Sequence, residues 1–292
     1  RRHVLTGPET THADSSAMVE QFDVVVIGGG PGGSAAATYL ARVGMDVALI
    51  EKEHHPRFHV GESLLPHSLP ILEELGVLEE TKKIGQFKPG ADFISEDGSQ
   101  NTVFEFGHAL TPGPDHAYHV PRAEFDQLLF RQAEESGART FEGLSAAVTS
   151  CDISGAVVEA QDELGSKHVF HASFLIDASG RSTVSARMSG GPRPDRHTSS
   201  AAIFGHFRNV PRAPDPEGGN IRIHLTHPGW MWEIPLPDGI TSIGLVVPGE
   251  DLAQRDGSVE EFFEARTGRN PMMAAALADA VPTGVLSTTG HF

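Results

Sequence analysis

The pattern of apolar positions along the chain is most regular over residues 22–52. A continuous β-branched run at 24–27 predicts a strand that is buried on both faces. Small residues and good helix formers at 34–42 predict a helix that ends at Gly44. A second apolar run at 47–50 predicts the next strand. This order of strand, turn, helix and strand is typical of half of a doubly wound, dinucleotide-binding α/β fold.

The turn between the first strand and the helix carries glycines at G-x-G-x-x-G spacing, at Gly28, Gly30 and Gly33. They permit a tight turn, a close approach of a pyrophosphate to the backbone, and close packing of the helix on the sheet. Glu51 ends the second strand 23 residues after Gly28, near the spacing of about 20 residues at which an acid binds a ribose hydroxyl. An acid here favours FAD or NAD over NADP. Lys52 follows Glu51 and is included among the candidate cofactor-binding residues.

The apolar period changes several times along the rest of the chain. Helical spacing predicts helices at 64–75, 77–83, 119–137, 260–266 and 272–280. Short apolar runs predict a hairpin at 87–106 around Asp97–Gly98, and strands at 139–142, 144–149, 156–160, 168–171, 174–176, 201–208, 220–225, 231–234 and 240–247. Residues 61–63 are expected to turn into the helix at 64–75, and 190–196 to form a Pro/Gly linker. The mixture of α/β and antiparallel stretches predicts two interleaved domains.

Composition limits the classes of function. A length of 292 residues allows one large or two modest domains. The formal net charge of -17 argues against nucleic acid or an anionic membrane as a partner. The single cysteine, Cys151, excludes an internal disulfide, fits a reducing cytoplasm, and is expected to be a small buried hydrophobe. No apolar run approaches the length of a membrane-spanning helix.

The histidines and the N-terminal segment add little chemistry. The 16 histidines, among them His54, His55 and His59, show no metal-ligand spacing, so we predict no metal site and expect these residues on the surface or in loops. Residues 1–20 lack the pattern of a secretory signal. We expect them to be disordered or non-native, with the natural start at Met18.

Several motifs together resemble the FAD-dependent monooxygenase superfamily: GGGPGG with Glu51, VPRAEFDQLL at 120–129 and LIDASGRST at 175–183. Within it, HVGESLLP at 59–66 and GWMWEIP at 229–235 resemble the flavin-dependent halogenases, which carry a Trp-x-Trp-x-Ile-Pro motif. The form of the GESLLP segment resembles the phenol and pyrrole branch more than the tryptophan branch.

The resemblance implies a fold and its boundaries. The fold is an FAD-binding, Rossmann-like α/β domain of the glutathione-reductase type, interleaved with an antiparallel β-sheet substrate domain. Residues 21–88 and 119–188 would form the FAD-binding domain, and 89–118 and 189–292 the substrate domain. The family has a further Gly-Asp motif that closes the flavin site, and nothing in 248–292 matches it. We therefore expect the substrate domain to be incomplete at its C-terminus.

The resemblance also implies roles for individual residues. The three glycines would hold the FAD pyrophosphate and Glu51 the adenosine ribose. Arg122 would reach the flavin or its phosphates, and Asp177 with Gly180 would form the second cofactor motif. Glu62 is a catalytic candidate expected near the flavin, and from the residues alone it also fits an acid at a helix terminus. From the residues alone, Arg122 is equally expected to pair with Glu124 or Asp126, and the turn at 177–180 is a common one.

The implied chemistry starts from FADH2 delivered by a separate flavin reductase, because the sequence has no second dinucleotide motif. Reduced FAD reacts with O2, chloride or bromide attacks the flavin hydroperoxide, and hypohalous acid reaches a lysine. The resemblance matches this lysine best to Lys88, with Lys82 and Lys83 as alternatives that also read as a solvated helix end. Burial would lower the pKa of such a lysine, so that its neutral amine could form a chloramine.

The resemblance also implies a role for two tryptophans and a class of substrate. Trp230 and Trp232 lie at i and i+2, and so on one face of a strand, where they would separate flavin from substrate; without the resemblance they read as core packing. The substrate would be an electron-rich aromatic, possibly bound to a carrier protein. The rival interpretations are a flavin hydroxylase or prenyl-chain reductase on the same scaffold, and a non-catalytic FAD-binding fragment.

Overall fold

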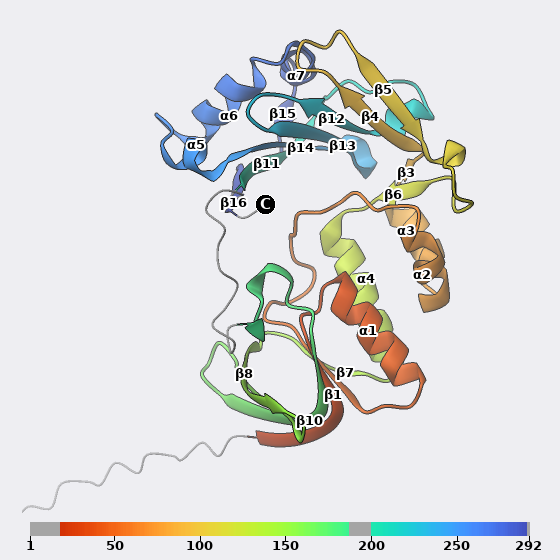
Figure 1. Cartoon of the computed structure of the whole chain (residues 1–292), viewed down its shortest axis with the longest axis vertical. Helices are drawn as coiled ribbons and strands as arrows, with labels where there is room; N and C mark the ends of the chain where they lie inside the picture. The colour runs from red at the N-terminus through yellow and green to blue at the C-terminus, as the bar shows by residue number, and fades with distance from the viewer. Residues whose placement is uncertain (1–17, 187–199, 291–292) are drawn as a thin grey trace, which may run out of the picture. The chain divides into compact units, whose positions relative to one another are not determined.

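The computed structural model describes residues 18–186 and 200–290. The chain divides into two compact units (Figure 1). Unit 1 comprises Arg1–His54 and Ala133–Gly191, and unit 2 comprises His55–Gln132 and Pro192–Phe292. Each unit is built from two separate stretches of chain, as the interleaved fold requires. Residues 55–88 and 119–132 belong to the compact unit 2, whereas the sequence analysis assigned them to the FAD-binding domain. The boundaries of the FAD-binding and substrate domains therefore remain a prediction.

Unit 1 is built on a six-stranded sheet with the order β7-β2-β1-β10-β9-β8. The pairs β7–β2, β2–β1 and β1–β10 are parallel, and β10–β9 and β9–β8 are antiparallel. The strands are β1 (Met18–Ile27), β2 (Val47–Ile50), β7 (Arg139–Phe141), β8 (Ser145–Asp152), β9 (Gly155–Gln161) and β10 (Lys167–Asp177). Helix α1 (Pro31–Arg42) connects β1 to β2, and the short helix η2 (Gly180–Ser182) follows β10. The expected Rossmann-like arrangement is confirmed.

The central strands of unit 1 are buried for a simple reason. Val25, Ile27, Ala48 and Ile50 belong to one apolar cluster that also includes Phe170 of β10. Strands covered on both faces need apolar residues at every position, which explains the continuous runs in the sequence. At roughly 25 cal/mol per Å² of apolar surface removed from water, such side chains each contribute about 1.5–3 kcal/mol.

Unit 2 contains an eight-stranded sheet with the order β15-β11-β14-β13-β12-β4-β5, in which β16 also pairs with β11. Its strands are β4 (Gly90–Ile94), β5 (Asn101–Glu105), β11 (Ser200–Arg208), β12 (Ile221–Leu225), β13 (Trp230–Pro235), β14 (Thr241–Pro248), β15 (Val281–Pro282) and β16 (Ser287–Gly290). The pairing is antiparallel except between β12 and β4. The expected antiparallel sheet is therefore present.

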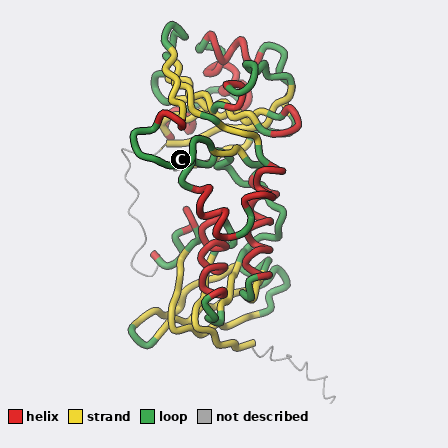
Figure 2. The backbone as a smooth tube through the Cα atoms, turned by 90° about the vertical axis from the view of Figure 1, so that its right-hand side faces the viewer, coloured by secondary structure: helices red, strands yellow, loops and turns green. Residues whose placement is uncertain are grey.

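Helices and a smaller ribbon complete unit 2. Helices α5 (Gly249–Ala253), α6 (Val259–Thr267) and α7 (Pro271–Leu277) lie on one face of the large sheet (Figure 1), where Phe263 and Met273 pack with residues of β11, β13 and β14. The other elements are α2 (Ser68–Leu75), α3 (Leu78–Ile84), β3 (Gln86–Lys88), β6 (Ala117–His119), α4 (Arg122–Glu135), η1 (Phe106–His108), η4 (Glu217–Gly219) and η5 (Pro237–Gly239). Figure 2 shows strands in yellow and helices in red from a second direction.

The structure corrects several boundaries. β1 begins at Met18 and pairs with β10 from that residue, so 18–20 belong to the sheet and not to a disordered extension. β10 is one strand where the sequence predicted two. The helix expected at 64–75 begins only at Ser68, because the backbone of 62–64 is extended along β6: Leu64 N–H donates to Tyr118 O, and Glu62 O accepts from Val120 N–H. Residues 1–17 and the predicted linker at 190–196 lie outside the described residues.

Candidate active site

The glycine turn of unit 1 has the geometry that its spacing predicts. Gly28 has φ +106°, a conformation that favours glycine. A Cβ at Gly33 would lie 1.9 Å from Gly28 O, so only glycine lets α1 approach the turn this closely. Gly30 is the N-cap of α1 and Pro31 stands at the helix start, with no side-chain cap hydrogen bond and no acid in the first turn. The first N–H groups of the helix are thus left for an anion.

Glu51 supports this turn directly. Its side chain is buried, and its Oε2 accepts a hydrogen bond from Gly29 N–H at 2.8 Å, while Oε1 accepts from Glu53 N–H at 3.0 Å. The carboxylate therefore holds the glycine turn against the end of β2. Lys52 beside it is exposed. Contact of either residue with a ribose remains a prediction.

Asp177 and Gly180 lie beside the glycine turn. Asp177 is opposite Ile27 in the β1–β10 register, and a Cβ at Gly28 would meet Ala178 O at 2.4 Å. Partial burial raises the pKa of Asp177, but hydrogen bonds from the side chains and backbones of Ser179 and Ser185 outweigh it and lower the pKa to about 2. The glycine turn, Glu51 and the turn at 177–180 thus meet at one edge of the sheet, although the last lies more than 120 residues from the other two in sequence.

These features test whether unit 1 fits FAD. The carboxyl ends of parallel β1, β2 and β10 carry the glycine turn, an uncapped helix N-terminus and two carboxylates. A dinucleotide binds at this edge of such sheets, with its pyrophosphate on the helix N-terminus. The donor set therefore fits the pyrophosphate and ribose of FAD.

In unit 2, the candidate residues gather along one segment without regular secondary structure, residues 58–64, which we call the GES segment. Carbonyl oxygens and side chains along it contact several elements: Arg122 Nη1 donates to Val60 O at 2.8 Å, and Lys88 Nζ donates to Leu64 O at 2.9 Å. The expected turn into a helix at 61–63 is wrong. Instead Ser63 forms a bridge with His119 of β6, and Gly61 has φ +108°.

Lys88 is the most unusual side chain of this group. It is only 2% exposed, and burial lowers its pKa to about 8. Its Nζ donates to Ser63 Oγ at 2.8 Å as well as to Leu64 O, and lies 5.1 Å from the centre of the Phe106 ring. A buried amine with no carboxylate partner among the described residues is costly to keep charged.

The alternative lysines differ from Lys88 in every respect. Lys82 and Lys83 are exposed and pair with Glu79 and Glu80 one turn earlier on α3, and hydrogen bonds from those pairs raise their pKa values. They lie in the last turn of α3 and are exposed to solvent. Burial and electrostatics therefore favour Lys88 as the functional lysine.

His119 is a neutral neighbour of Lys88. β3 and β6 form a two-stranded ribbon in which Lys88 is opposite Ala117, so His119 lies diagonally on the same face. Burial, with a smaller contribution from Lys88, lowers the pKa of His119 to about 3, and its Nε2 lies 3.0 Å from Gly219 O. His119 thus adds no positive charge beside the lysine.

Glu62 pairs with a residue that the sequence analysis missed. Its buried carboxylate lies 2.6 Å from His206 Nε2 of β11. The Phe58 ring stacks on Phe204 at 6.0 Å between ring centroids and meets the His206 ring edge-on. No local signal marks His206, because the partner lies 144 residues away. Expecting the histidines on the surface or in loops was also wrong for the buried His119 and His224.

Arg122 forms the ion pair that was left open as an alternative to cofactor contact. Its guanidinium binds both oxygens of Asp126, at 2.7 and 2.9 Å, and Arg57 Nη1 lies 3.1 Å from the same carboxylate. Asp126 is fully buried. The pair on Asp126 positions Arg122 so that it also reaches Val60 O on the GES segment.

The tryptophans lie together, as their spacing predicts. Their ring centroids are 5.8 Å apart, and both pack with Phe204 and Val60 in one cluster. Trp232 is buried and donates to Ser242 Oγ at 3.2 Å, and a Cβ at Gly244 would overlap its ring. Gly244 therefore provides the space for this indole.

Two further expectations concern the rest of the chain. Cys151, expected to be buried, is exposed on β8. Among residues 18–186 and 200–290, no group of three or more His, Cys, Asp or Glu side chains is placed to hold a metal ion. Within the same ranges, no helix has the length and hydropathy needed to cross a membrane.

Comparison with known proteins agrees with this geometry. The family described as FAD binding domain matches residues 21–276. The chlorinase of 1H-pyrrole-2-carbonyl peptidyl-carrier protein from Pseudomonas fluorescens is 35% identical over 267 residues, which cover 83% of this chain and 59% of that protein. The chain thus spans less than two thirds of this relative's length.

Two solved structures are similar throughout. A flavoprotein/dehydrogenase from Cytophaga hutchinsonii superimposes with a TM-score of 0.84 at 32% identity, covering 94% of this chain and 67% of that one. The myxobacterial chondrochloren halogenase CndH, described as a variant of FAD-dependent halogenases, gives a TM-score of 0.83 at 34% identity and covers 92% of this chain and 64% of that one. The chain therefore belongs to the FAD-binding flavoproteins and, within them, to the flavin-dependent halogenase family.

Proposed function

We propose that the full-length protein uses FADH2, O2 and chloride or bromide to halogenate an electron-rich aromatic of the phenol or pyrrole type. The observation that carries this proposal is Lys88, a buried lysine whose pKa is lowered to about 8 and which has no carboxylate partner among the described residues. The Pseudomonas relative, a chlorinase of a carrier-bound pyrrole, supports the substrate class.

Reduced FAD, supplied by a separate flavin reductase, would provide hypohalous acid from O2 and halide when bound. The glycine turn, Glu51 and Asp177 would hold its adenosine and pyrophosphate parts. Arg122 would orient the GES segment, and His206 would hold the Glu62 carboxylate in place. Trp230 and Trp232 would form an apolar wall that excludes water.

Lys88 would act on hypohalous acid in one of two ways. The ammonium donates a hydrogen bond that orients the acid. Alternatively, the neutral amine attacks the halogen: the O–Cl bond breaks, an N–Cl bond forms, and one amine proton leaves with hydroxide as water. The aromatic carbon then takes the chlorine and loses its proton, which restores the amine. With a pKa of about 8, roughly a tenth of Lys88 is neutral at pH 7.

The test uses the full-length protein with a flavin reductase, NADH, O2, chloride and a phenol or a carrier-bound pyrrole. The proposal predicts a product in which one chlorine replaces one hydrogen, with the chlorine isotope pattern, and a bromine analogue when bromide replaces chloride. A product that gains only oxygen or hydrogen would overturn it in favour of a hydroxylase or reductase. The similarity to a flavoprotein/dehydrogenase makes this comparison worthwhile.

A second outcome concerns the cofactor. A purified protein without flavin absorbance after incubation with FAD would favour a non-catalytic member of the family. The incomplete coverage of the relatives makes the full-length protein the correct material for this measurement.

A further inference from the structure

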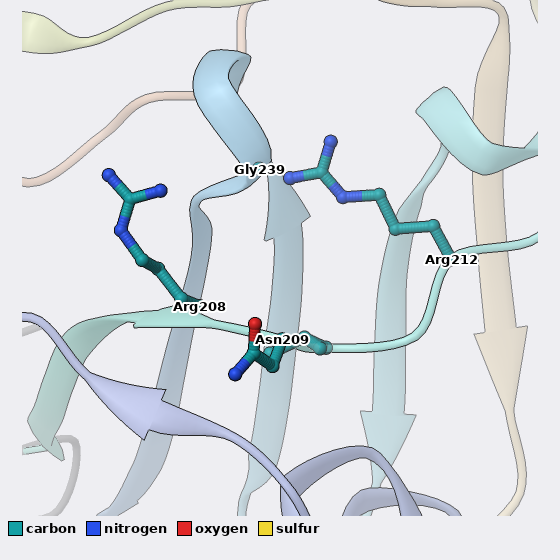
Figure 3. Close-up of a pocket in the computed structure, with 5 residues that line it drawn as sticks. Arg208, Asn209, Arg212 and Gly239 are labelled. Carbon is teal, nitrogen blue, oxygen red and sulfur yellow. The ribbon is translucent and has the colours of Figure 1, made fainter.

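Unit 2 contains a hollow of about 400 Å³ that no proposed step of the reaction uses. It is lined by Arg208, Asn209, Val210, Arg212 and Gly239. Figure 3 shows Arg212 extending toward the turn at Gly239, with the guanidinium of Arg208 on the other side of this turn. Arg208 ends β11, and η5, which contains Gly239, lies in the connection between β13 and β14. We call this site the arginine hollow.

The two arginines of the hollow lack a direct carboxylate partner, although Glu233 and Asp215 act on Arg212 electrostatically. Among the described residues, neither has an acidic side chain within ion-pair distance. Five other arginines do have carboxylate partners: Arg57, Arg122, Arg139, Arg222 and Arg266. In a chain with a formal net charge of -17, a hollow lined by two arginines without ion-pair partners and by no acid is a local exception.

The hydrogen bonds of both groups go to neutral oxygens. Arg208 Nη1 donates to Asp238 O at 3.0 Å. Arg212 Nη2 donates to Leu236 O at 2.9 Å, to Ile240 O, and to Thr241 Oγ1 at 3.3 Å. One terminal nitrogen of each guanidinium is used, so the other terminal nitrogen and Nε keep free N–H donors among the described residues. Burial also lowers the pKa of Arg212, and a bound anion would offset that desolvation.

The backbone around the hollow is held in an uncommon conformation. Asn209 and Asp238 have φ of 62° and 57°, and Gly239 has φ of 70°. Non-glycine residues in this left-handed region are uncommon and cluster at turns and ligand clamps. The hydrogen bonds from the arginines to 236–240 fix the turn, so the two guanidinium groups are preorganised on both sides of it.

The chemistry of the hollow selects its ligand. A guanidinium offers parallel N–H groups that match phosphate or carboxylate oxygens, and two such groups suit a phosphate with several oxygens. The volume exceeds what a halide ion needs, since a water molecule occupies only about 30 Å³ in the liquid. A phosphate with a short attached chain fits better.

We propose that the arginine hollow binds the phosphate of the prosthetic arm by which a carrier protein presents the aromatic substrate. This inference rests on the proposed function for the source of the phosphate, since the related chlorinase acts on a carrier-bound pyrrole. A carrier arm is attached through a phosphodiester, so an anion site in unit 2 would fix the arm independently of the aromatic ring.

The test measures binding to the full-length protein by calorimetry, without turnover. The probes are pantetheine 4′-phosphate, pantetheine and inorganic phosphate. We expect pantetheine 4′-phosphate to bind best, and Arg208→Gln to weaken it at least tenfold, or about 1.4 kcal/mol. Arg255→Gln is the matched control, because Arg255 lines a different hollow and also donates to a carbonyl, that of Leu252. It should leave the affinity unchanged.

Two further variants keep the test independent of folding. Asn209→Gly removes the side-chain amide but retains the left-handed backbone. Arg212→Lys keeps the positive charge but loses the parallel N–H groups of the guanidinium. Both variants should bind pantetheine 4′-phosphate more weakly while their circular dichroism spectra stay unchanged. The proposal is overturned if Arg208→Gln binds like wild type, if pantetheine binds as tightly as its phosphate, or if inorganic phosphate binds as tightly as the arm. Arginine-dependent binding in a protein that fails to halogenate would refute the proposed function and not this site.

Discussion

The glycine turn of unit 1 and the GES segment of unit 2 reach functional geometry by opposite routes. In unit 1, the site is formed mainly by backbone: glycines, strand ends and a helix N-terminus. The Glu51 side chain adds one hydrogen bond, from Gly29 N–H, that stabilises the turn. In unit 2, residues 58–64 have no helix or strand of their own, and side chains from α4, β3 and β11 fix them. A site made of backbone can be recognised from local spacing, whereas one made of side chains depends on the whole fold.

The largest effect on function should come from filling the glycine turn. Gly33→Ala places a Cβ 1.9 Å from Gly28 O, and forcing α1 outward should destabilise the protein by about 3 kcal/mol and abolish FAD binding. Gly32→Ala is the control, because a Cβ at Gly32 meets nothing within 4 Å. Flavin fluorescence titration and urea unfolding measure both changes. Normal FAD binding by Gly33→Ala would show that the close packing of α1 is not required.

The next prediction tests whether buried side-chain contacts stabilise unit 2. Asp126→Asn removes the buried charge that Arg57 and Arg122 share, and uncompensated buried cations typically cost about 3–5 kcal/mol. Urea unfolding should show this loss. Glu124→Gln, an exposed acid on the same helix, should change stability by less than about 0.5 kcal/mol. Equal effects of the two variants would contradict the role of Asp126.

A third prediction concerns the pH dependence of stability that Lys88 causes. Its folded pKa of about 8 lies below the ordinary lysine pKa of 10.5, so between these values the unfolded chain binds more protons and stability rises with pH. The penalty for the buried charge is complete below pH 8 and amounts to at most about 3 kcal/mol. Lys88→Met should remove this rise between pH 8 and 10. The check is the melting temperature across that range, and an identical pH slope in both proteins would refute the lowered pKa.

The smallest effect should come from the partner of Glu62. His206→Ala leaves a buried carboxylate without its hydrogen-bond donor, which should cost about 1–3 kcal/mol. His206→Gln can still donate and should recover most of that loss. Melting temperatures of the two variants measure the difference, and equal values would mean that the contact contributes only packing.

These contrasts explain what could be predicted from sequence. Local spacing predicts the strand, turn and helix at 24–50, the turn at 177–180 and the pairing of the two tryptophans. In the structure the two turns are adjacent and the two indole rings are in contact, as expected. His206 could not be found, since only the fold places it against Glu62. The prediction that a helix starts at residue 64 was wrong for the same reason, because the pairing of 62–64 with β6 overrides the local preference for helix.

The central claim is that the chemistry depends on Lys88 of unit 2, whereas unit 1 holds the cofactor. The most direct measurement compares Lys88→Ala with Lys82→Ala in the full-length protein, supplied with FAD, a flavin reductase, NADH, O2, chloride and substrate. The account predicts that Lys88→Ala binds FAD and still consumes NADH to form peroxide but yields no chlorinated product, and that Lys82→Ala, at an exposed helix end, chlorinates like wild type. Chlorination by Lys88→Ala at the wild-type rate would contradict it.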